Sequence, residues 1–317
     1  MRELSTTQVI IREAQSRGIA AVCFPDADEN VYELSYNGRS EYIYYSNSDH
    51  FGSVIYKIFG NKKLTTELLR QGGFPVPADR IVSNIEEAKE FLAEYKKIVV
   101  KPVSNTGGIG ITVGVTEETQ LEQALKTAIE YNKSNNAQEK AVCQEYVEGR
   151  DFRLLVINRE HVFVAERIPA HVVGNGRSTV KELIEESNNA IAEAYHIHLK
   201  EEAESLLKEQ CVEADTVLEE GQAVRLARVA NAHAGGTVCD MTDMVGEDIK
   251  EQARAVAKYF RVPVVGIDCL SNDITKSIGY LIELNSTPDI TIHHSPDRGE
   301  SRNVAATIVD MLFPETV

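Results

Sequence analysis

The pattern of apolar and polar positions along the chain predicts helices and strands in a mixed order. Apolar residues recur at helical spacing in several stretches, which are 5–17, 61–73, 84–96, 117–133, 178–210, 246–260 and 302–313. Compact apolar runs bounded by turn residues predict strands at 19–24, 97–102, 141–147, 152–157, 223–229, 262–270 and 279–285. Tight turns join several of these strands, so the sequence predicts an α+β fold with mixed sheets rather than one parallel sheet.

Composition and charge narrow the class of protein. The 317 residues suffice for one large domain or two to three compact lobes, and 43% hydrophobic residues are ordinary for a globular chain. No apolar run approaches the roughly 18 residues of a spanning helix, and the N-terminus lacks a signal-peptide pattern. We therefore expect a cytoplasmic protein with no membrane contact. The formal net charge of -16 argues against nucleic acid as a partner.

The cysteines indicate no metal or disulfide framework. None of the five forms a C-x-x-C pair. They are Cys23, Cys143, Cys211, Cys239 and Cys269. We expect reduced, buried thiols with structural roles.

Two β-rich runs near the C-terminus carry polar side chains with oxygen donors. Asp268 ends the run 264–268, and Glu283 and Asn285 belong to the run 281–285. Residues two apart in a strand share a face, so Glu283 and Asn285 point together, and antiparallel pairing would bring Asp268 beside them. Two carboxylates and one amide oxygen suit Mg²⁺ that bridges phosphates. Ordinary polar residues at strand ends are the alternative.

A glycine-rich segment follows a lysine at the end of an apolar strand. The segment SNTGGIG, 104–110, would let backbone N–H groups approach phosphate oxygens. It is not a Walker loop because no GK[ST] follows, and a hairpin turn is the alternative. Lys101 precedes it, and a lysine is rarely buried without a partner, which a phosphate would provide. Lys62 is a second candidate, with a solvated surface lysine as its alternative.

Two further segments carry candidate ligand contacts. Gln144 and Glu145 lie on an apolar strand that runs into a turn, and an extended backbone edge there can read adenine. The alternative is a plain strand and turn. Arg225 and Arg228 lie in an otherwise apolar run, where an arginine suits a phosphoryl group or a carboxylate. A surface ion pair is the alternative for Arg225.

In this order, the motifs resemble those of the ATP-grasp superfamily. The chain is most similar to the ATP-grasp part of cyanophycin synthetases and of bifunctional glutamate–cysteine ligase/glutathione synthetases. The stretches that carry the resemblance cover nearly the whole chain and are GNKKLTTELLRQGGFPVP, VVKPVSNTGGIGITVGV, EYVEGRDFRLLVIN, ERIPAHVVGNGRSTVKELIE, ARVANAHAGGTVCDMTD, VVGIDCL, IELNSTPDITIHHSP and NVAATIVDMLFP. The resemblance implies an ATP-grasp fold of three lobes, with ATP held between two α+β lobes. The implied division is an N-terminal lobe 1–80, a central lid lobe 81–152 and a C-terminal lobe 153–317 with the metal site.

The resemblance also implies a role for each matching residue. The expected phosphate and lid contacts are Lys62, Lys101, Ser104, Thr106, Gly107, Gly108 and Gly110. The expected adenine and ribose contacts are Gln144, Glu145, Val147, Glu148 and Asp151. The expected metal ligands are Asp268, Glu283 and Asn285. The expected catalytic residues are Arg228, which would steady the γ-phosphoryl group, Lys101, Asn231 and Arg167. Substrate contacts are expected from Arg153, Arg167, His171, His293 and Ser295.

The sequence departs from the superfamily pattern at two motifs. Gln144 stands where a glutamate is frequent, and it can still accept a hydrogen bond from an adenine amine. The usual N-A-A-P-G after the last metal ligand reads N-S-T-P-D at 285–289. The large partner domains of the similar enzymes have no counterpart in this sequence, so their second activities are not inferred.

The activity implied by the resemblance is that of a carboxylate–amine ligase that forms an acyl phosphate from ATP. Two Mg²⁺ ions are expected, with Mn²⁺ as a possible substitute, and the partners are a small-molecule carboxylate and amine. Ligases of this kind are often dimers or tetramers. The alternatives are an ATP-grasp kinase, a ligase of the D-alanine–D-alanine type, which ERIPAHVVGNG disfavours, and a nucleotide-binding regulatory protein without turnover.

Overall fold

The computed structural model describes residues 4–24, 28–103, 109–135, 137–189, 196–228 and 235–317. The named strands in these ranges form four sheets. Their pairings are antiparallel. The α+β class is therefore confirmed, but the expectation of mixed sheets is wrong. Neighbouring strands run in opposite directions because short hairpins or returning helices connect them.

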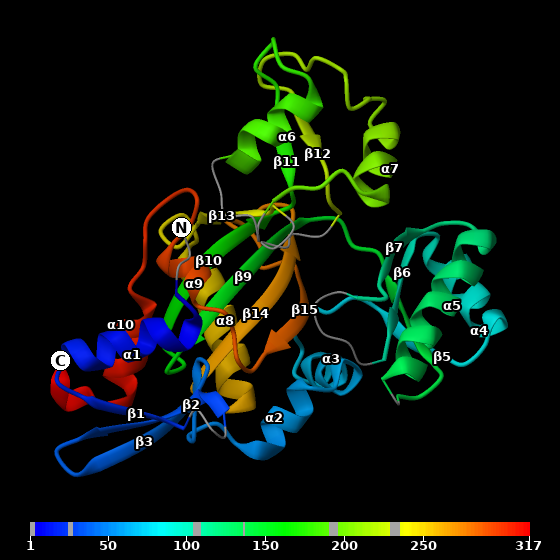
Figure 1. Cartoon of the computed structure of the whole chain (residues 1–317). Helices are drawn as coiled ribbons and strands as arrows, with labels where there is room; N and C mark the ends of the chain where they lie inside the picture. The colour runs from blue at the N-terminus through cyan, green and yellow to red at the C-terminus, as the bar shows by residue number, and fades with distance from the viewer. Residues whose placement is uncertain (1–3, 25–27, 104–108, 136, 190–195, 229–234) are drawn as a thin grey trace.

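A large sheet forms the centre of the molecule (Figure 1). Its strand order is β13–β10–β9–β14–β15, with bounds Thr237–Asp240, His161–Ile168, Arg150–Ile157, Val264–Ser271 and Tyr280–Asn285. Even-numbered residues of β9, such as Leu154, pack with helix α8, Glu247–Phe260. Odd-numbered residues, such as Leu155, face α1, Thr6–Ser16, and α10, Val304–Leu312. Side chains of a strand alternate between its two faces, and one end of the odd-numbered face of β9 carries polar side chains.

A second α+β unit lies beside β15 (Figure 1). Its sheet order is β5–β8–β6–β7, with bounds Asp79–Val82, Ala141–Glu145, Ile98–Pro102 and Thr112–Val115. Helices α4, Ile85–Tyr95, and α5, Glu118–Ser134, pack on this sheet and share its hydrophobic core. The chain segment that leads into this unit runs along β15. There, Leu281 N–H donates to Pro75 C=O at 2.8 Å. The two prolines of that segment keep it extended.

The N-terminal part of the chain contributes a four-stranded sheet and two helices. The strands β1 to β4 pair in sequence order, with bounds Ala20–Phe24, Asp28–Tyr36, Arg39–Tyr44 and Asn47–Ser48. Helices α2, Ser53–Phe59, and α3, Lys62–Gln71, then lead to the second unit. The hairpin β2–β3 turns at Asn37 and Gly38, both with positive φ, which is an Asn-Gly turn of the kind that suits the strand twist.

The stretch 178–210, predicted as one helix, is two helices within a separate small unit. This unit pairs β11, His171–Val173, with β12, Ala223–Arg225, and has its own hydrophobic core. Its helices are α6, Val180–Asn189, and α7, Glu201–Glu209. Asn188 bonds through its side-chain amide to both backbone groups of Ile197, at 2.7 and 2.8 Å. Ile197 is buried in the small core, and residues 196–200, which precede α7, are not helical.

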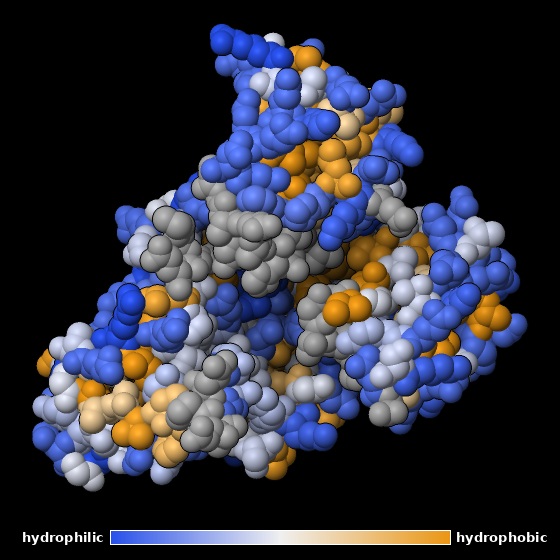
Figure 2. Space-filling view, viewed as in Figure 1, coloured by the Kyte–Doolittle hydropathy of each residue, from blue (hydrophilic) through white to orange (hydrophobic). Residues whose placement is uncertain are grey.

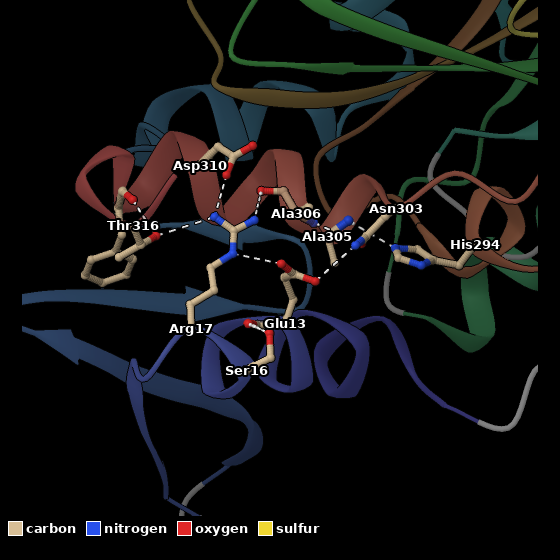
Figure 3. A network of polar contacts seen from close by, with 10 residues as sticks. Glu13, Ser16, Arg17, His294, Asn303, Ala305, Ala306, Asp310 and Thr316 are labelled. Atoms are coloured by element: carbon tan, nitrogen blue, oxygen red, sulfur yellow. Dashed lines mark hydrogen bonds and ion pairs between the residues drawn. The ribbon is translucent and has the colours of Figure 1, made fainter.

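Polar contacts connect α1, α10 and the short helix α9, Thr291–His294 (Figure 3). Glu13 accepts from Arg17 Nε at 2.8 Å and from Asn303 Nδ2 at 3.0 Å. His294 Nε2 accepts from the backbone N–H of Ala305 at 3.0 Å, within the first turn of α10. The helix start thereby gains an acceptor for one of its free donors. These contacts position α9 next to the large sheet. In the described ranges, no helix is long and apolar enough to cross a membrane.

Candidate active site

Strands β14 and β15 bring the three predicted metal ligands to one place. Asp268 pairs in register with Glu283, and Gly266 pairs with Asn285, in an antiparallel ladder. The pairing that the sequence argument required is therefore present. We refer to Asp268, Glu283 and Asn285 as the oxygen-donor set. On the other side of β14, Asp268 is in register with Arg153 of β9.

Two arginines hold the carboxylate of Asp268. Arg153 donates to both of its oxygens, and Arg167 Nη2 lies 3.1 Å from Oδ2. Arg167 also donates to Asp151 Oδ1 at 2.6 Å. Burial would raise the pKa of Asp268, but the two guanidinium groups hold that pKa below its usual range. Burial raises the pKa of Asp151, and Arg167 opposes that rise. Residues predicted for substrate, ribose and metal therefore form one ion-paired group.

Lys62 and Lys101 lie next to the oxygen-donor set. Lys62 begins α3, and its Nζ is 3.3 Å from Glu283 Oε1. Lys101 is buried at the end of β6, and its Nζ donates to Gln144 Oε1 at 3.1 Å. Burial first, and then the charge of Lys62, lower the pKa of Lys101 to about 8. A buried ammonium with one neutral partner has donors left for an anion.

The predicted adenine segment is the end of β8, which is paired with β5 and β6, and the turn after it. The backbone N–H of Glu145 donates to the carbonyl of Ala78 at 2.8 Å, and Glu145 Oε2 accepts from Ala78 N–H at 3.2 Å. Val147 is half-buried and Glu148 is exposed in the connection to β9. A Cβ on Gly149 would lie 2.8 Å from the backbone nitrogen of Ser271, so this turn fits closely against β14. The turn thus joins the second unit to the large sheet beside Asp151.

Most of the predicted lid loop lies outside the described residues. This applies to Ser104, Thr106, Gly107 and Gly108, and also to the predicted catalytic residue Asn231. Gly110 is described and has φ +77°, and a Cβ there would lie 2.9 Å from the ring of Pro102. Only glycine suits that position without displacement.

Arg228 lies in the small unit and is held by α7. Its side chain pairs with Glu209, and its backbone N–H donates to Glu202 at 3.1 Å. Within the described ranges it makes no hydrogen bond or ion pair with the oxygen-donor set. His171 belongs to the same unit, with Nδ1 2.9 Å from the carbonyl of Pro169. Ser295 follows α9, where its N–H donates to Thr291 C=O at 2.9 Å.

His293 is buried, and neither ring nitrogen has a hydrogen-bond partner among the described residues. It faces the ring of Phe163, with centroids 6.3 Å apart, whereas His294 turns toward α10. The two adjacent histidines thus point to different parts of the structure. Burial first, and then the positive charge of Arg153, lower the pKa of His293 to about 3. His293 is therefore neutral near pH 7 and can donate one hydrogen bond and accept another.

His293 should make the fold sensitive to acid. Its folded pKa of about 3 lies below the ordinary unfolded value of about 6.5. Its stabilising contribution is therefore complete above pH 6.5 and is lost toward pH 3, by about 1.4 kcal/mol per pH unit. Between pH 7 and 5, the free energy of unfolding should fall less in His293→Leu than in the wild type. Denaturant titrations measure this, with the exposed His161→Leu as control. Equal pH slopes for all three proteins would contradict the assignment.

The cysteines offer no activated nucleophile in the described site. Cys143 and Cys269 are buried, and burial raises the pKa of Cys143 to about 12 and raises that of Cys269 as well. Cys211 is exposed, and Cys23 and Cys239 are only partly buried, so the expectation that all five thiols are buried is wrong for these three residues.

The molecular surface has a hollow where three parts of the fold meet. Figure 2 shows this hollow where the second α+β unit, the small unit and the large sheet come together, with hydrophilic residues on part of its floor. Lys63 and Arg70 of α3 both pair with Asp79 at the start of β5, at 2.9 and 2.6 Å. These ion pairs connect the helix that carries Lys62 to the unit that carries Lys101. The two lysines are thereby placed on opposite sides of one junction.

Comparison with known proteins agrees with this arrangement. Residues 59–290 match the family described as ATP-grasp domain. The chain is 33% identical to a cyanophycin synthetase of Geminocystis herdmanii, over 98% of this chain and 36% of that protein. It is also 33% identical to a glutathione biosynthesis bifunctional protein of Clostridium perfringens, over 98% and 41% respectively. A bifunctional glutathione synthetase from Pasteurella multocida has a TM-score of 0.73 and 27% identity, over 99% of this chain and 45% of that one.

The fold and the matches define a protein of two α+β units, with lysines, arginines and strand-borne carboxylates near their junction. The chain belongs to the ATP-grasp family, whose enzymes use ATP and a divalent metal. The expected resemblance and the ATP-grasp fold are thus confirmed. The chain spans less than half the length of these relatives.

Proposed function

We propose that this chain is an ATP- and magnesium-dependent carboxylate–amine ligase that joins amino-acid-type substrates and releases ADP and phosphate. The observation that carries the proposal is the in-register pair Asp268–Glu283, with Asn285 on the next strand position of the same face and Lys62 3.3 Å from Glu283. Carboxylates beside a lysine on two paired strands suit a metal-bound triphosphate. The relatives' names point to the same class of reaction.

The oxygen-donor set fits magnesium. Its members are two carboxylates and one amide on paired strands, all with hard oxygen donors. We propose two Mg²⁺ ions, for which Mn²⁺ can substitute. When bound there, they would neutralise charge on the β- and γ-phosphates. Lys62 and Lys101 would bind the same phosphates, with Ser104, Thr106, Gly107, Gly108 and Gly110 above them.

The remaining residues would orient the nucleotide and the substrates. Gln144, Glu145 and Val147 would contact adenine, and Glu148 or Asp151 the ribose. Once Asp268 faces a cation, Arg153 and Arg167 are available to bind a substrate carboxylate in bidentate geometry. We assign further substrate contacts to His171, His293 and Ser295. ATP would lie between the lobe 81–152 and the C-terminal lobe 153–317, with 1–80 as the N-terminal lobe.

The reaction would proceed in two steps. A carboxylate oxygen of the first substrate attacks the γ-phosphorus, the bond to the bridging oxygen breaks, and ADP leaves. The amine of the second substrate then attacks the acyl carbon, loses a proton, and phosphate leaves. Arg228 would steady the transferring group together with Lys101, Asn231 and Arg167. The protein would contribute mainly position and charge, as in other phosphoryl transfers. For such a ligase we propose small-molecule partners, a cytoplasmic location and a homo-oligomer.

Hydroxylamine trapping tests the proposed intermediate. With ATP, magnesium and a screen of amino acids and short peptides as carboxylates, we expect a hydroxamate to form without any amine substrate. Arg228→Ala should lower the hydroxamate and amide yields together, because both products depend on one phosphoryl transfer. Mass spectrometry and ADP release measure both.

Each alternative function predicts a different outcome of this experiment. A kinase would give a stable phosphorylated product, and a regulatory protein would release no ADP. Rapid amide formation without hydroxamate would speak against an accessible acyl phosphate. A normal hydroxamate yield from Arg228→Ala would remove Arg228 from the mechanism. Because Arg228 pairs with Glu209, Glu209→Gln is the matched variant that should retain the reaction.

A further inference from the structure

Residues 286–290, which follow the oxygen-donor set in the sequence, are fixed by hydrogen bonds from residues in the N-terminal part of the chain. Asn47 Nδ2 donates to the carbonyl of Ser286 at 2.7 Å. Ser46 Oγ donates to the carbonyl of Pro288, also at 2.7 Å. These bonds join residues about 240 positions apart in the sequence. Ser46 and Asn47 are 2% and 5% exposed, so little water competes for these two bonds.

A tight hairpin brings these two donors to the segment. Tyr44 pairs with Asn47 across β3 and β4, which leaves Tyr45 and Ser46 as the turn. Tyr45 has φ +52°, an uncommon conformation for a bulky residue. The hydroxyl of Ser46 then reaches Pro288 rather than solvent. The surrounding contacts maintain this uncommon turn, as expected where a strained backbone positions a functional group.

Asp289, which departs from the usual N-A-A-P-G motif, makes a third contact that fixes this segment. Thr6 Oγ1 donates to the Asp289 carboxylate at 2.9 Å and accepts from Ile290 N–H at 3.2 Å. The position of Asp289 is a glycine in the usual motif and could not make this bond. The segment 286–290 is therefore fixed at both of its ends.

The segment 286–290 contacts residues of the active site. A Cβ on Gly266 would lie 2.7 Å from Pro288 and 3.2 Å from Arg153 Cδ, so Pro288 and Arg153 flank the same point of β14. Asn285 lies one residue before Ser286, whose carbonyl Asn47 holds, and its backbone pairs with Gly266 on the other side. The loss of the bond to Ser286 would therefore free the backbone next to Asn285 and change the direction of its side chain.

We propose that Ser46 and Asn47 are positioning residues, which hold Asn285 in the direction needed for metal-dependent nucleotide binding. This inference rests on the proposed function, because it takes Asn285 as a metal ligand. The N-terminal hairpin is then a functional part of the active site and acts through Asn285 without touching the nucleotide. Groups that orient metal ligands typically change metal affinity by about 10- to 100-fold when removed.

Calorimetry with ADP tests this inference without knowledge of the substrates. We compare the affinity for ADP with and without Mn²⁺ in the wild type, Ser46→Ala, Asn47→Ala and Ser46→Thr. Both alanine variants should lose about 10-fold in affinity with Mn²⁺ and keep the affinity for metal-free ADP. Ser46→Thr retains a hydroxyl and should bind like the wild type. Ser48→Ala is the matched control, because Ser48 lies on the same hairpin and accepts only from His50 N–H among the described side-chain bonds.

The outcomes separate this inference from the proposed function. If Mn²⁺ does not strengthen ADP binding in the wild type, the metal site itself is wrong. If Mn²⁺ strengthens binding equally in the wild type, Ser46→Ala and Asn47→Ala, only the positioning role is wrong. Equal losses with and without Mn²⁺ would indicate a general structural effect and also overturn it. Should Asn47→Ala fail to fold, the comparison of Ser46→Ala with Ser46→Thr decides.

Discussion

Replacing Glu283 by glutamine is expected to lower the ATP-dependent reaction rate by at least about 100-fold, equivalent to about 2.7 kcal/mol of barrier. The amide keeps the shape of the side chain but removes the negative charge that would face the metal. Glu283 is partly exposed, and its one ion pair among the described residues is with Lys62, so the free energy of unfolding should change by less than about 1 kcal/mol. ADP release and thermal unfolding of the same preparation measure both effects.

Asp268→Asn should differ from Glu283→Gln in its effect on stability. Asp268 is buried between Arg153 and Arg167, so the neutral amide leaves Arg153 without its anion and leaves Arg167 with Asp151 alone. Breaking a buried pair in this way costs about 3–5 kcal/mol. The control is Glu130→Gln in α5, where an exposed carboxylate is changed and activity should persist. Normal ADP release from both Glu283→Gln and Asp268→Asn would disprove the metal assignment.

Replacing Lys101 by methionine should weaken nucleotide binding without weakening the fold. Burial lowers the pKa of Lys101 to about 8, which means that keeping its charge at pH 7 costs the nucleotide-free protein about 3 kcal/mol. Methionine removes that cost but leaves Gln144 Oε1 without its donor, a loss of about 1–3 kcal/mol. The net stability should therefore stay level or rise. Nucleotide affinity should fall by about 10- to 100-fold, because a hydrogen bond to a charged group is lost.

The pH dependence provides a second measure of the same group. Between pH 8 and 10.5 the unfolded chain keeps the proton of Lys101 while the folded chain loses it. The contribution of Lys101 to the free energy of unfolding therefore rises with pH in that range. Affinity for a non-hydrolysable ATP analogue should fall as pH rises through 8 in the wild type but not in Lys101→Met. Lys126→Met, at an exposed position, is the control. An unchanged affinity in Lys101→Met would remove this lysine from the phosphate site.

Local sequence patterns predicted many elements because their signals are complete within one segment. Helix α3 has Asn61 as its cap and a glycine pair after it, and α8 has an apolar stripe that the core buries. Strands β14 and β15 are apolar runs with one polar face. The hairpin β2–β3 was missed although Asn37-Gly38 is a strong turn signal, because the flanking strands carry many polar residues.

Other features depended on contacts that a local pattern does not contain. The split of 178–210 into α6 and α7 follows from the bonds of Asn188 to Ile197 and from a small separate core. Strand β10 carries the adjacent charged residues Glu166 and Arg167 after an apolar run, and these residues become acceptable there only when partners on β9 neutralise them. Pairing with β9 therefore determined that these charged residues can lie within the strand.

The sequence by itself determined the order of the motifs, the lysines of α3 and β6, and the face shared by Glu283 and Asn285. These follow from residue type and from the strand period of two, which are local properties. Only the tertiary structure decided that Arg153 and Arg167 meet Asp268, that Glu209 holds Arg228, and that Ser46 and Asn47 support the segment after Asn285. Such contacts join residues far apart in the chain, and their partners are chosen by sheet register and by the requirement that buried polar groups find hydrogen bonds.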